Sequence, residues 1–207
     1  MKKTLWILFG FLAVSIGLYP GIYFVLDRRF GLLATKSEAL LSDVFWNVGF
    51  YTHIIFGGLA LLIGWVQFSP RLRRTRLPLH RRIGKIYVVA ALLGGLAGIG
   101  IGTQATGGWA AALGFMSLGV VWVYTTFTAY RHIRAGRVTA HQKMMTYSYA
   151  ACFGAATLRL WMPFLIMLFG DFILAYQVVA WLCWVPNVVV AWWLNGRLQP
   201  EFEAKKA

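Results

Sequence analysis

The stretch "GKIYVVAALLGGLAGIGIGTQAT", residues 84–106, decides the class of this protein. After one lysine near its start it contains only apolar and small residues until its polar end. About 20 such residues, rising ~1.5 Å each, cross the ~30 Å hydrocarbon core of a bilayer. Because backbone groups in lipid must bond within their own segment, the stretch predicts a transmembrane α-helix.

Five further segments of the 207-residue chain have the same character. The composition agrees, because 59% hydrophobic and only 13% charged residues leave too little polar surface for a soluble domain. We therefore expect an all-α membrane bundle that forms a single domain over residues 1–207, with an outer loop at 27–45 and basic inner loops at 69–83 and 131–143. The six predicted helices lie near residues 5–26, 46–68, 84–106, 109–130, 144–169 and 174–194.

The formal net charge of +14 indicates membrane topology and no nucleic-acid partner, because the basic residues lie between long apolar runs. Lysine and arginine concentrate in residues 71–85 and 131–143, which lie on one side of a six-helix bundle. The positive-inside rule places that side, and both termini, in the cytoplasm of a bacterium, with anionic lipid head groups near the basic loops. The other basic residues fit this topology: Lys2, Lys3, Arg197, Lys205 and Lys206 inside, and Arg28, Arg29 and Lys36 outside.

The outer connection at residues 27–45 is the only long one. An irregular loop is the simpler expectation for it. The alternative is a short amphipathic helix at the membrane interface, with an apolar face made of Phe30, Leu32, Leu33, Leu40 and Leu41.

Histidines head two faces of small residues within the predicted helices. His53 is followed at helical spacing by Gly57, Ala60 and Gly64. The second face is headed by His80 and consists of Gly84, Tyr87, Ala91, Gly94, Gly98 and Gly102. Its repeat of glycine at 94, 98 and 102 admits a neighbouring helix or a flat ligand. Helix packing is the favoured interpretation, including contact with a second copy of the chain.

The fifth segment carries a polar or small face along its whole length. Its ends, His141 and Arg159, are about 27 Å apart along a helix, which implies two polar layers near the two membrane surfaces.

The two cysteines, Cys152 and Cys183, have no metal-type spacing and are expected to be small buried side chains. The residues of interest are His141, Met145, Ser148, Cys152, Ala155 and Arg159 on the fifth segment, and Gln177, Trp181, Cys183, Trp184 and Asn187 on the sixth, where Pro186 predicts a bend.

Three chemistries compete for the inner layer. His80 and His141 could be the two iron ligands of a single b-type haem, with basic side chains on the propionates. A zinc site is disfavoured because no inner carboxylate lies nearby in sequence. Capture of an anion is the third, and the structural alternative is that these residues only fix topology. The inner layer consists of His80, Arg81, Arg82, His132, His141 and Lys143.

The outer layer is defined by His53 and Arg159, which lie at comparable predicted depth. A lone arginine within an apolar run needs a partner. A pocket lined by aromatic residues, Trp161, Phe50 and Tyr51, would suit a quinone carbonyl or a carboxylate. The structural alternative is an ion pair with Asp171 or Asp43.

The segments "HIIFGGLALLIGWVQFSPRLRRTRLPLHRRIGKIYVV" and "AHQKMMTYSYAACFGAATLRLWMPF" resemble a family of predicted bacterial membrane proteins classed as a domain of unknown function. The match covers roughly residues 50–165. Gln142 stands where the family pattern leads us to expect an arginine. The resemblance implies that the shared polar positions are His53, His80, Arg81, Gly84, Tyr87, His141, Tyr149 and Arg159.

A weaker similarity exists to transmembrane b-type cytochromes, but a single outer histidine cannot supply a second bis-histidine haem. The leading hypothesis is a redox membrane protein that binds one b-type haem or a quinone. In it, Arg81, Tyr87 and Tyr149 line the site of the two inner histidines, and the outer layer forms a second pocket. The alternative is a non-catalytic membrane component, a lipid- or anion-binding, transport-type or accessory protein.

Overall fold

Six helical segments of the protein are long and apolar enough to cross a membrane, as a computed structural model shows for residues 3–26 and 30–197. The all-α, six-helix prediction is therefore confirmed. Each of the six spans contains most of one predicted apolar run. The basic residues Lys2, Arg28, Arg29, Lys205 and Lys206, which entered the prediction of topology, lie outside the described residues.

The six spans and three short connecting helices account for nearly all of the described chain. The spans are α1 (Lys3–Leu18) with η1 (Tyr19–Phe24), α3 (Val44–Gly64) with η3 (Trp65–Phe68), α5 (Leu77–Gly102), α6 (Gly108–Arg134), α7 (Val138–Cys152) with α8 (Gly154–Phe169), and α9 (Phe172–Leu182) with α10 (Val185–Gly196). The connecting helices are η2 (Gly31–Thr35), α2 (Glu38–Ser42) and α4 (Pro70–Thr75).

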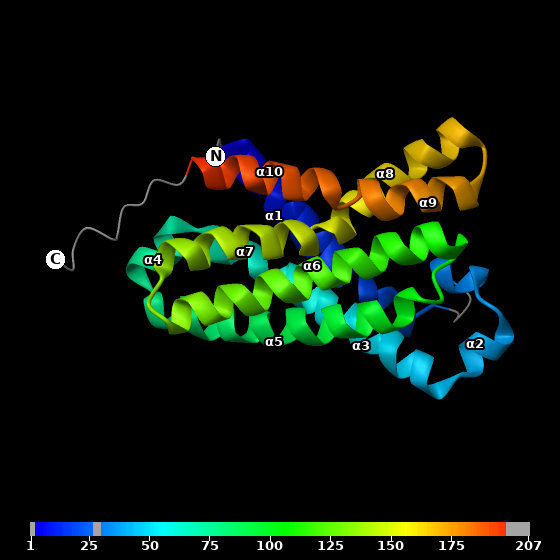
Figure 1. The fold of residues 1–207 in the computed structure, drawn as a ribbon, viewed down its shortest axis with the longest axis horizontal. Helices are drawn as coiled ribbons and strands as arrows, with labels where there is room; N and C mark the ends of the chain where they lie inside the picture. Colours follow the sequence, from blue (N-terminus) through cyan, green and yellow to red (C-terminus); the bar gives the residue numbers. More distant parts are fainter. Residues whose placement is uncertain (1–2, 27–29, 198–207) are drawn as a thin grey trace.

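The helices pack largely in chain order. α3 packs on α5, α5 on α6, and α6 on α7 and α9, while α1 covers α3 and α10 covers α7. In Figure 1, α4 and the turn between α6 and α7 lie at one end of the bundle, and α2 and the turn between α8 and α9 lie at the other. We refer to these as the α4 end and the α2 end.

Two helices extend further toward the α4 end than hydropathy predicts. α5 begins at Leu77, with Pro78 in its first turn, and α7 begins at Val138. Both start about two turns before the predicted apolar segments. The predicted basic loops at 69–83 and 131–143 are thus mostly helical, because a helix continues past the apolar run that hydropathy detects, and proline is favourable in a first turn.

The segment before α3 is folded, so the expectation of an irregular outer loop is wrong. Leu33 of η2 and Leu41 of α2 are buried against Trp46 and Phe50 of α3. Two of the apolar residues that the sequence spaces along this segment are thus buried against the bundle, and this burial stabilises the two short helices.

Polar contacts fasten the same segment to the loop between α5 and α6. The Lys36 ammonium donates to the carbonyl of Gln104, and the hydroxyls of Thr35 and Thr106 lie 2.9 Å apart. Partial burial lowers the pKa of the Lys36 amine from its ordinary value. The α2 end is therefore covered by a docked cap.

The fifth and sixth spans are both interrupted, at Phe153 and at Cys183–Trp184. The predicted bend near Pro186 is thus a break directly before it, because proline has no N–H for the carbonyl one turn earlier. Side chains replace the missing backbone bonds: the Thr157 hydroxyl and the Asn187 amide both donate to the carbonyl of Cys183. Asn187 also donates to Thr157 Oγ1 at 3.0 Å, so the two interruptions are tied together.

The glycine face of α5 packs within the chain. A Cβ at Gly94 would lie 3.0 Å from the backbone nitrogen of Gly57, and one at Gly98 would lie 2.7 Å from Nδ1 of His53. At Gly102 it would lie 2.7 Å from Met116. The helix-packing interpretation of this face is confirmed within the chain, since α3 and α6 occupy the face. Contact of Gly94, Gly98 and Gly102 with a second copy stays a prediction.

The tightest approach in the core is at Gly64, where α3 ends. A Cβ there would lie 2.4 Å from Tyr149 and 2.8 Å from Tyr87, and both rings are buried. No side chain larger than hydrogen fits, so the contact of α3 with α5 and α7 requires glycine at this position.

We predict that Gly64→Ala lowers the free energy of unfolding by roughly 1–3 kcal/mol, because the added methyl must displace buried rings. Thermal unfolding of the purified protein in detergent measures the effect. Gly57→Ala on the same helix is the control, because in the described part of the chain nothing lies within 4 Å of a Cβ there. Equal midpoints for the two variants would contradict the packing described.

Candidate functional site

Arg159 on α8 lies among tyrosines from two other elements. Its guanidinium carbon is 4.2 Å from the ring centroid of Tyr19, and Nη1 donates to the carbonyl of Ala155 at 2.8 Å. Tyr23 of η1 and Tyr176 of α9 are also close enough for its charge to act on them. These four side chains, Arg159, Tyr19, Tyr23 and Tyr176, form what we call the arginine cluster.

Among the residues that the structure describes, no carboxylate pairs with Arg159. Asp43 and Asp171, the acidic partners considered from the sequence, instead accept from backbone N–H groups and cap α3 and α9. The predicted ion pair is therefore wrong. A guanidinium has five N–H donors, and one of them is used in a hydrogen bond here.

The aromatic residues around Arg159 differ from those predicted. Trp161 is 42% exposed on the outside of the bundle, and Phe50 lies behind Tyr23 with a centroid separation of 5.4 Å. The sequence reasoning missed Tyr19 and Tyr23, although their spacing of four at the end of the first span was a usable signal. Their hydroxyls lie within 4 Å of where a Cβ of Gly31 would be, so η2 covers the cluster.

His53 lies near the arginine cluster, as the predicted depths require. Its Nδ1 is 2.8 Å from the carbonyl oxygen of Gly94, its ring rests on Gly98, and the charge of Arg159 acts on it. Because a carbonyl oxygen can only accept, Nδ1 carries the proton, and Nε2 of a neutral ring keeps its lone pair. His53 joins α3 to α5 and has one ring nitrogen left for another partner.

The centre of the bundle contains a closed circuit of hydrogen bonds that begins and ends on Trp122. The Thr126 hydroxyl donates to the Trp122 carbonyl at 2.7 Å, so it can only accept from Ser148, which lies 2.6 Å away. Ser148 then accepts from Tyr87 at 2.8 Å, and Tyr87 accepts from Trp122 Nε1 at 3.4 Å. Every hydroxyl proton has a defined acceptor, so Tyr87 is part of the structural core.

Tyr149 has a similar role beside this circuit. Its hydroxyl donates to the carbonyl of Leu61 at 2.9 Å, and its side chain is only 2% exposed. The cysteines are buried and unpaired, as expected. Tyr87 and Tyr149, predicted to line a cofactor site, thus have their hydroxyls bonded to the protein itself.

The α4 end gathers buried polar atoms that lack partners. Gln67 of η3 is 8% exposed, and both its side-chain nitrogen and oxygen are buried without a hydrogen bond. Nδ1 of His80, Nδ1 of His132 and Oδ1 of Asn195 are in the same condition. Within residues 3–26 and 30–197, the remaining atom of this kind is Nε1 of Trp46 at the α2 end.

The structure also brings the two predicted inner histidines together. His141 and the arginines Arg73 and Arg81 are close enough for their charges to act on His80. Nδ1 of His141 is 2.9 Å from the carbonyl oxygen of Ala129, which leaves Nε2 as its free nitrogen. We call Gln67, His80 and His141 the glutamine cluster.

The structure gives His141 a hydrogen-bond geometry that suits a haem ligand, but the glycine face of α5 provides no space for the porphyrin. A haem-binding histidine commonly bonds Nδ1–H to a carbonyl and gives Nε2 to iron, as His141 could. The glycines predicted to provide clearance for a porphyrin are instead filled by α3 and α6. No group of three His, Cys, Asp or Glu side chains suited to a metal ion is present in the described chain.

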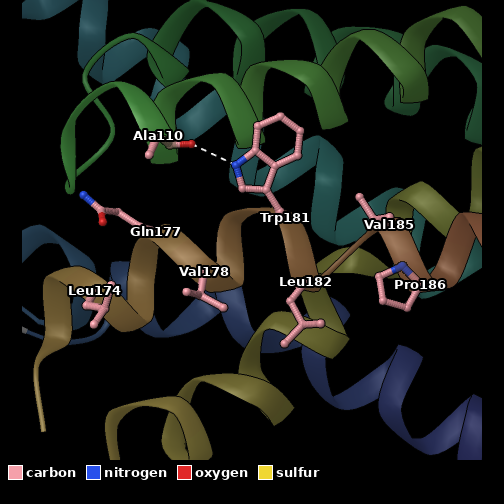
Figure 2. A pocket seen from close by; sticks show the side chains of 8 residues that line it. All are labelled: Ala110, Leu174, Gln177, Val178, Trp181, Leu182, Val185 and Pro186. Carbon is pink, nitrogen blue, oxygen red and sulfur yellow. Dashed lines mark hydrogen bonds between the residues drawn. The ribbon is translucent and has the colours of Figure 1, made fainter. Parts of the chain in front are cut away.

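A groove of about 630 Å³ lies between α6 and α9 (Figure 2). Its two polar side chains are bonded to backbone carbonyls at the start of α6: Gln177 donates to the carbonyl of Gly107, directly before the helix, and Trp181 to that of Ala110. The other lining residues are apolar, among them Leu174, Val178 and Leu182. The groove therefore offers packing surface for lipid and no free polar contact.

Residues 50–195 match the family described as Predicted membrane protein (DUF2306), and the chain belongs to this family. This confirms the resemblance stated from the sequence motifs. The matched region contains the glutamine cluster, His53 and Arg159 but neither Tyr19 nor Tyr23. No curated protein and no solved structure matches the chain.

We predict that Ser148→Ala lowers the free energy of unfolding by roughly 1–3 kcal/mol, because the Tyr87 proton loses its buried acceptor. Thermal or denaturant unfolding in detergent measures this. A double-mutant cycle with Tyr87→Phe should give a coupling of ~0.5–3 kcal/mol, since the two residues share one bond. Thr146→Ala is the control on α7, because its hydroxyl bonds only to Gln142 of its own helix. Additive effects of the two substitutions would contradict the circuit.

Proposed function

We propose that this member of the DUF2306 family binds a membrane-soluble small molecule with a carbonyl or carboxylate head at the arginine cluster, and that a quinone is the leading candidate. The observation that supports the proposal is the state of Arg159: a guanidinium at membrane depth that pairs with no carboxylate of the described chain. A charge in such a place is costly unless something compensates for it.

The chemistry of the cluster suits an oxygen acceptor. The unused guanidinium donors can bond a carbonyl or carboxylate oxygen, and such charge-assisted bonds are stronger than neutral ones. The ring of Tyr19 stacks on the cation, and the hydroxyls of Tyr23 and Tyr176 lie within range of the same charge. We assign the proposed redox role to quinone bound at the arginine cluster, because the glycine face leaves no room for a haem between the helices.

A structural role for Arg159 is the second candidate. The contact of Nη1 with the Ala155 carbonyl and the stacking on Tyr19 favour it, since together they join α8 to the end of the first span. In that case the chain is a non-catalytic membrane component, and removal of the guanidinium lowers stability without changing the binding of any small molecule.

We predict that Arg159→Leu weakens binding of a short-chain quinone by about 10- to 100-fold, which corresponds to loss of a charged hydrogen bond of about 1.5–3 kcal/mol. Quenching of tryptophan fluorescence during titration with quinone measures the affinity. The unfolding temperature should hold or rise, because an uncompensated charge is removed.

Arg197→Leu is the matched control for this experiment. Arg197 also lies over an aromatic ring, 3.5 Å from the centroid of Trp193, but it directly follows α10 at the α4 end. It should bind quinone as the unchanged protein does. A lower unfolding temperature for Arg159→Leu with unaltered quinone affinity would establish the structural role instead.

We further propose that the protein lies in the cytoplasmic membrane of a bacterium with its α4 end inside. The arginines of α4 and the first turns of α5 support this, because they concentrate positive charge at one end of the bundle. Anionic lipid head groups are the expected neighbours of that end.

Cysteine labelling tests the orientation. A membrane-impermeant maleimide should label Thr103→Cys in intact cells and label Arg74→Cys only after the membrane is opened, because both positions are exposed at opposite ends. The native Cys152 and Cys183 are 5% and 0% exposed and should give little background. Labelling of Arg74→Cys in intact cells would reverse the proposed orientation.

A further inference from the structure

The glutamine cluster is a second polar centre, at the end of the bundle opposite Arg159, and it is built from three elements. Gln67 comes from η3, His80 from the start of α5 and His141 from the start of α7. The oxygen Oε1 of Gln67 would lie 3.7 Å from a Cβ at Gly84, which is one helical turn from His80 on the same face of α5. Gln67 thus points at the face that His80 heads.

The burial of Gln67 is the feature that the fold does not explain. An amide buried without hydrogen bonds costs roughly 1–3 kcal/mol, and a glutamine carries two donors and an acceptor. Neither its nitrogen nor its oxygen has a partner among the described residues, and Nδ1 of His80 has none either. Three unpaired polar atoms on two adjacent elements require either bound water or a polar ligand.

The charges around the cluster select the sign of that ligand. The positive charges of Arg73 on α4 and Arg81 on α5 act on His80, and no carboxylate of the described chain lies on α4, on α5 or on α7. The N-termini of α5 and α7 add their partial positive charges, as α5 and α7 begin shortly before the two histidines. A cation would be repelled here, whereas an anion with several oxygen atoms would be attracted.

We propose that the glutamine cluster binds a phosphate group. The Gln67 amide and the His80 ring nitrogen would donate to its oxygens, and Arg73 and Arg81 would balance its charge. A phosphate offers enough acceptor oxygens for all of these donors. In free phosphate a protonated oxygen could also donate to Nε2 of His141, whereas a lipid phosphodiester would only accept hydrogen bonds. The group can belong to an anionic lipid of the same membrane surface or to free phosphate, and this site is independent of the arginine cluster.

The test compares two sources of phosphate on the same purified full-length protein. Native mass spectrometry of protein from nanodiscs of phosphatidylglycerol and phosphatidylcholine counts retained lipid, and thermal unfolding in detergent with and without inorganic phosphate measures stabilisation. Selective retention of phosphatidylglycerol supports a lipid phosphate, while a phosphate-dependent rise of the unfolding temperature without lipid selectivity supports free phosphate.

The variants Gln67→Leu and Gln67→Met remove the amide and keep the side-chain volume close to that of glutamine. We expect either one to weaken phosphate or lipid binding at least tenfold and to leave the unfolding temperature unchanged or higher without ligand, because unpaired polar atoms are removed. Gln142→Leu, a glutamine at the same end that lies outside the cluster, should bind normally. His80→Phe should reproduce the loss.

Two results would overturn the proposal. One is an unmodified protein that neither prefers phosphatidylglycerol nor gains stability from phosphate, which would mean that the cluster selects no anionic phosphate group. The other is unchanged binding by the Gln67 variants. Because the first result concerns the unmodified protein, it decides the question even if every variant fails to fold.

Discussion

Polar groups inside a membrane must find their partners within the protein, because lipid tails offer none. The arrangement of this bundle follows from that constraint. The circuit through Tyr87, Ser148 and Thr126 returns to the tryptophan on which it starts, so the centre has no free donor among its hydroxyls. The interruptions of the fifth and sixth spans are compensated in the same way, by Thr157 and Asn187. In the described chain, the buried polar side chains at the centre have hydrogen-bond partners, whereas several at the two ends have none. The ends are therefore the candidate binding sites.

The features that could be predicted from the sequence are those that depend on the order of residues along a single helix. Six spans, the small face of α5 and the depth of Arg159 relative to His53 all follow from the 3.6-residue period and the length of apolar runs. It failed where a contact depends on how separate elements meet. Trp161 faces outward because of how α8 packs, and Gln67 is buried because α4 and α5 fold back beside η3, and no local pattern of residues carries that information.

Two features near the ends of the spans could not be predicted from hydropathy: the folded segment before α3 and the tyrosines of the arginine cluster. The segment before α3 is polar enough to be read as a loop, yet Leu33 and Leu41 bury against Phe50 and hold a folded cap over the arginine cluster. The tyrosines of that cluster stand at the end of an apolar run, where aromatic residues are common as interfacial anchors. Their proximity to a guanidinium on α8 depends on how separate helices pack, so the sequence offered only Asp171 and Asp43 as structural partners for Arg159, and neither pairs with it.

The closed central circuit also affects whether a proton or ion could pass between the arginine cluster and the glutamine cluster. Conduction of a proton or ion from one end to the other needs groups that can release one partner and take another along the way. The hydroxyls of Thr126, Ser148 and Tyr87 each have their proton committed, and the residues between Tyr87 and His53 on the inner face of α5 and α3 are alanine, leucine and glycine. In this conformation the described chain therefore separates the arginine cluster from the glutamine cluster. That separation would let the two proposed sites, one at each end of the bundle, bind independently of each other.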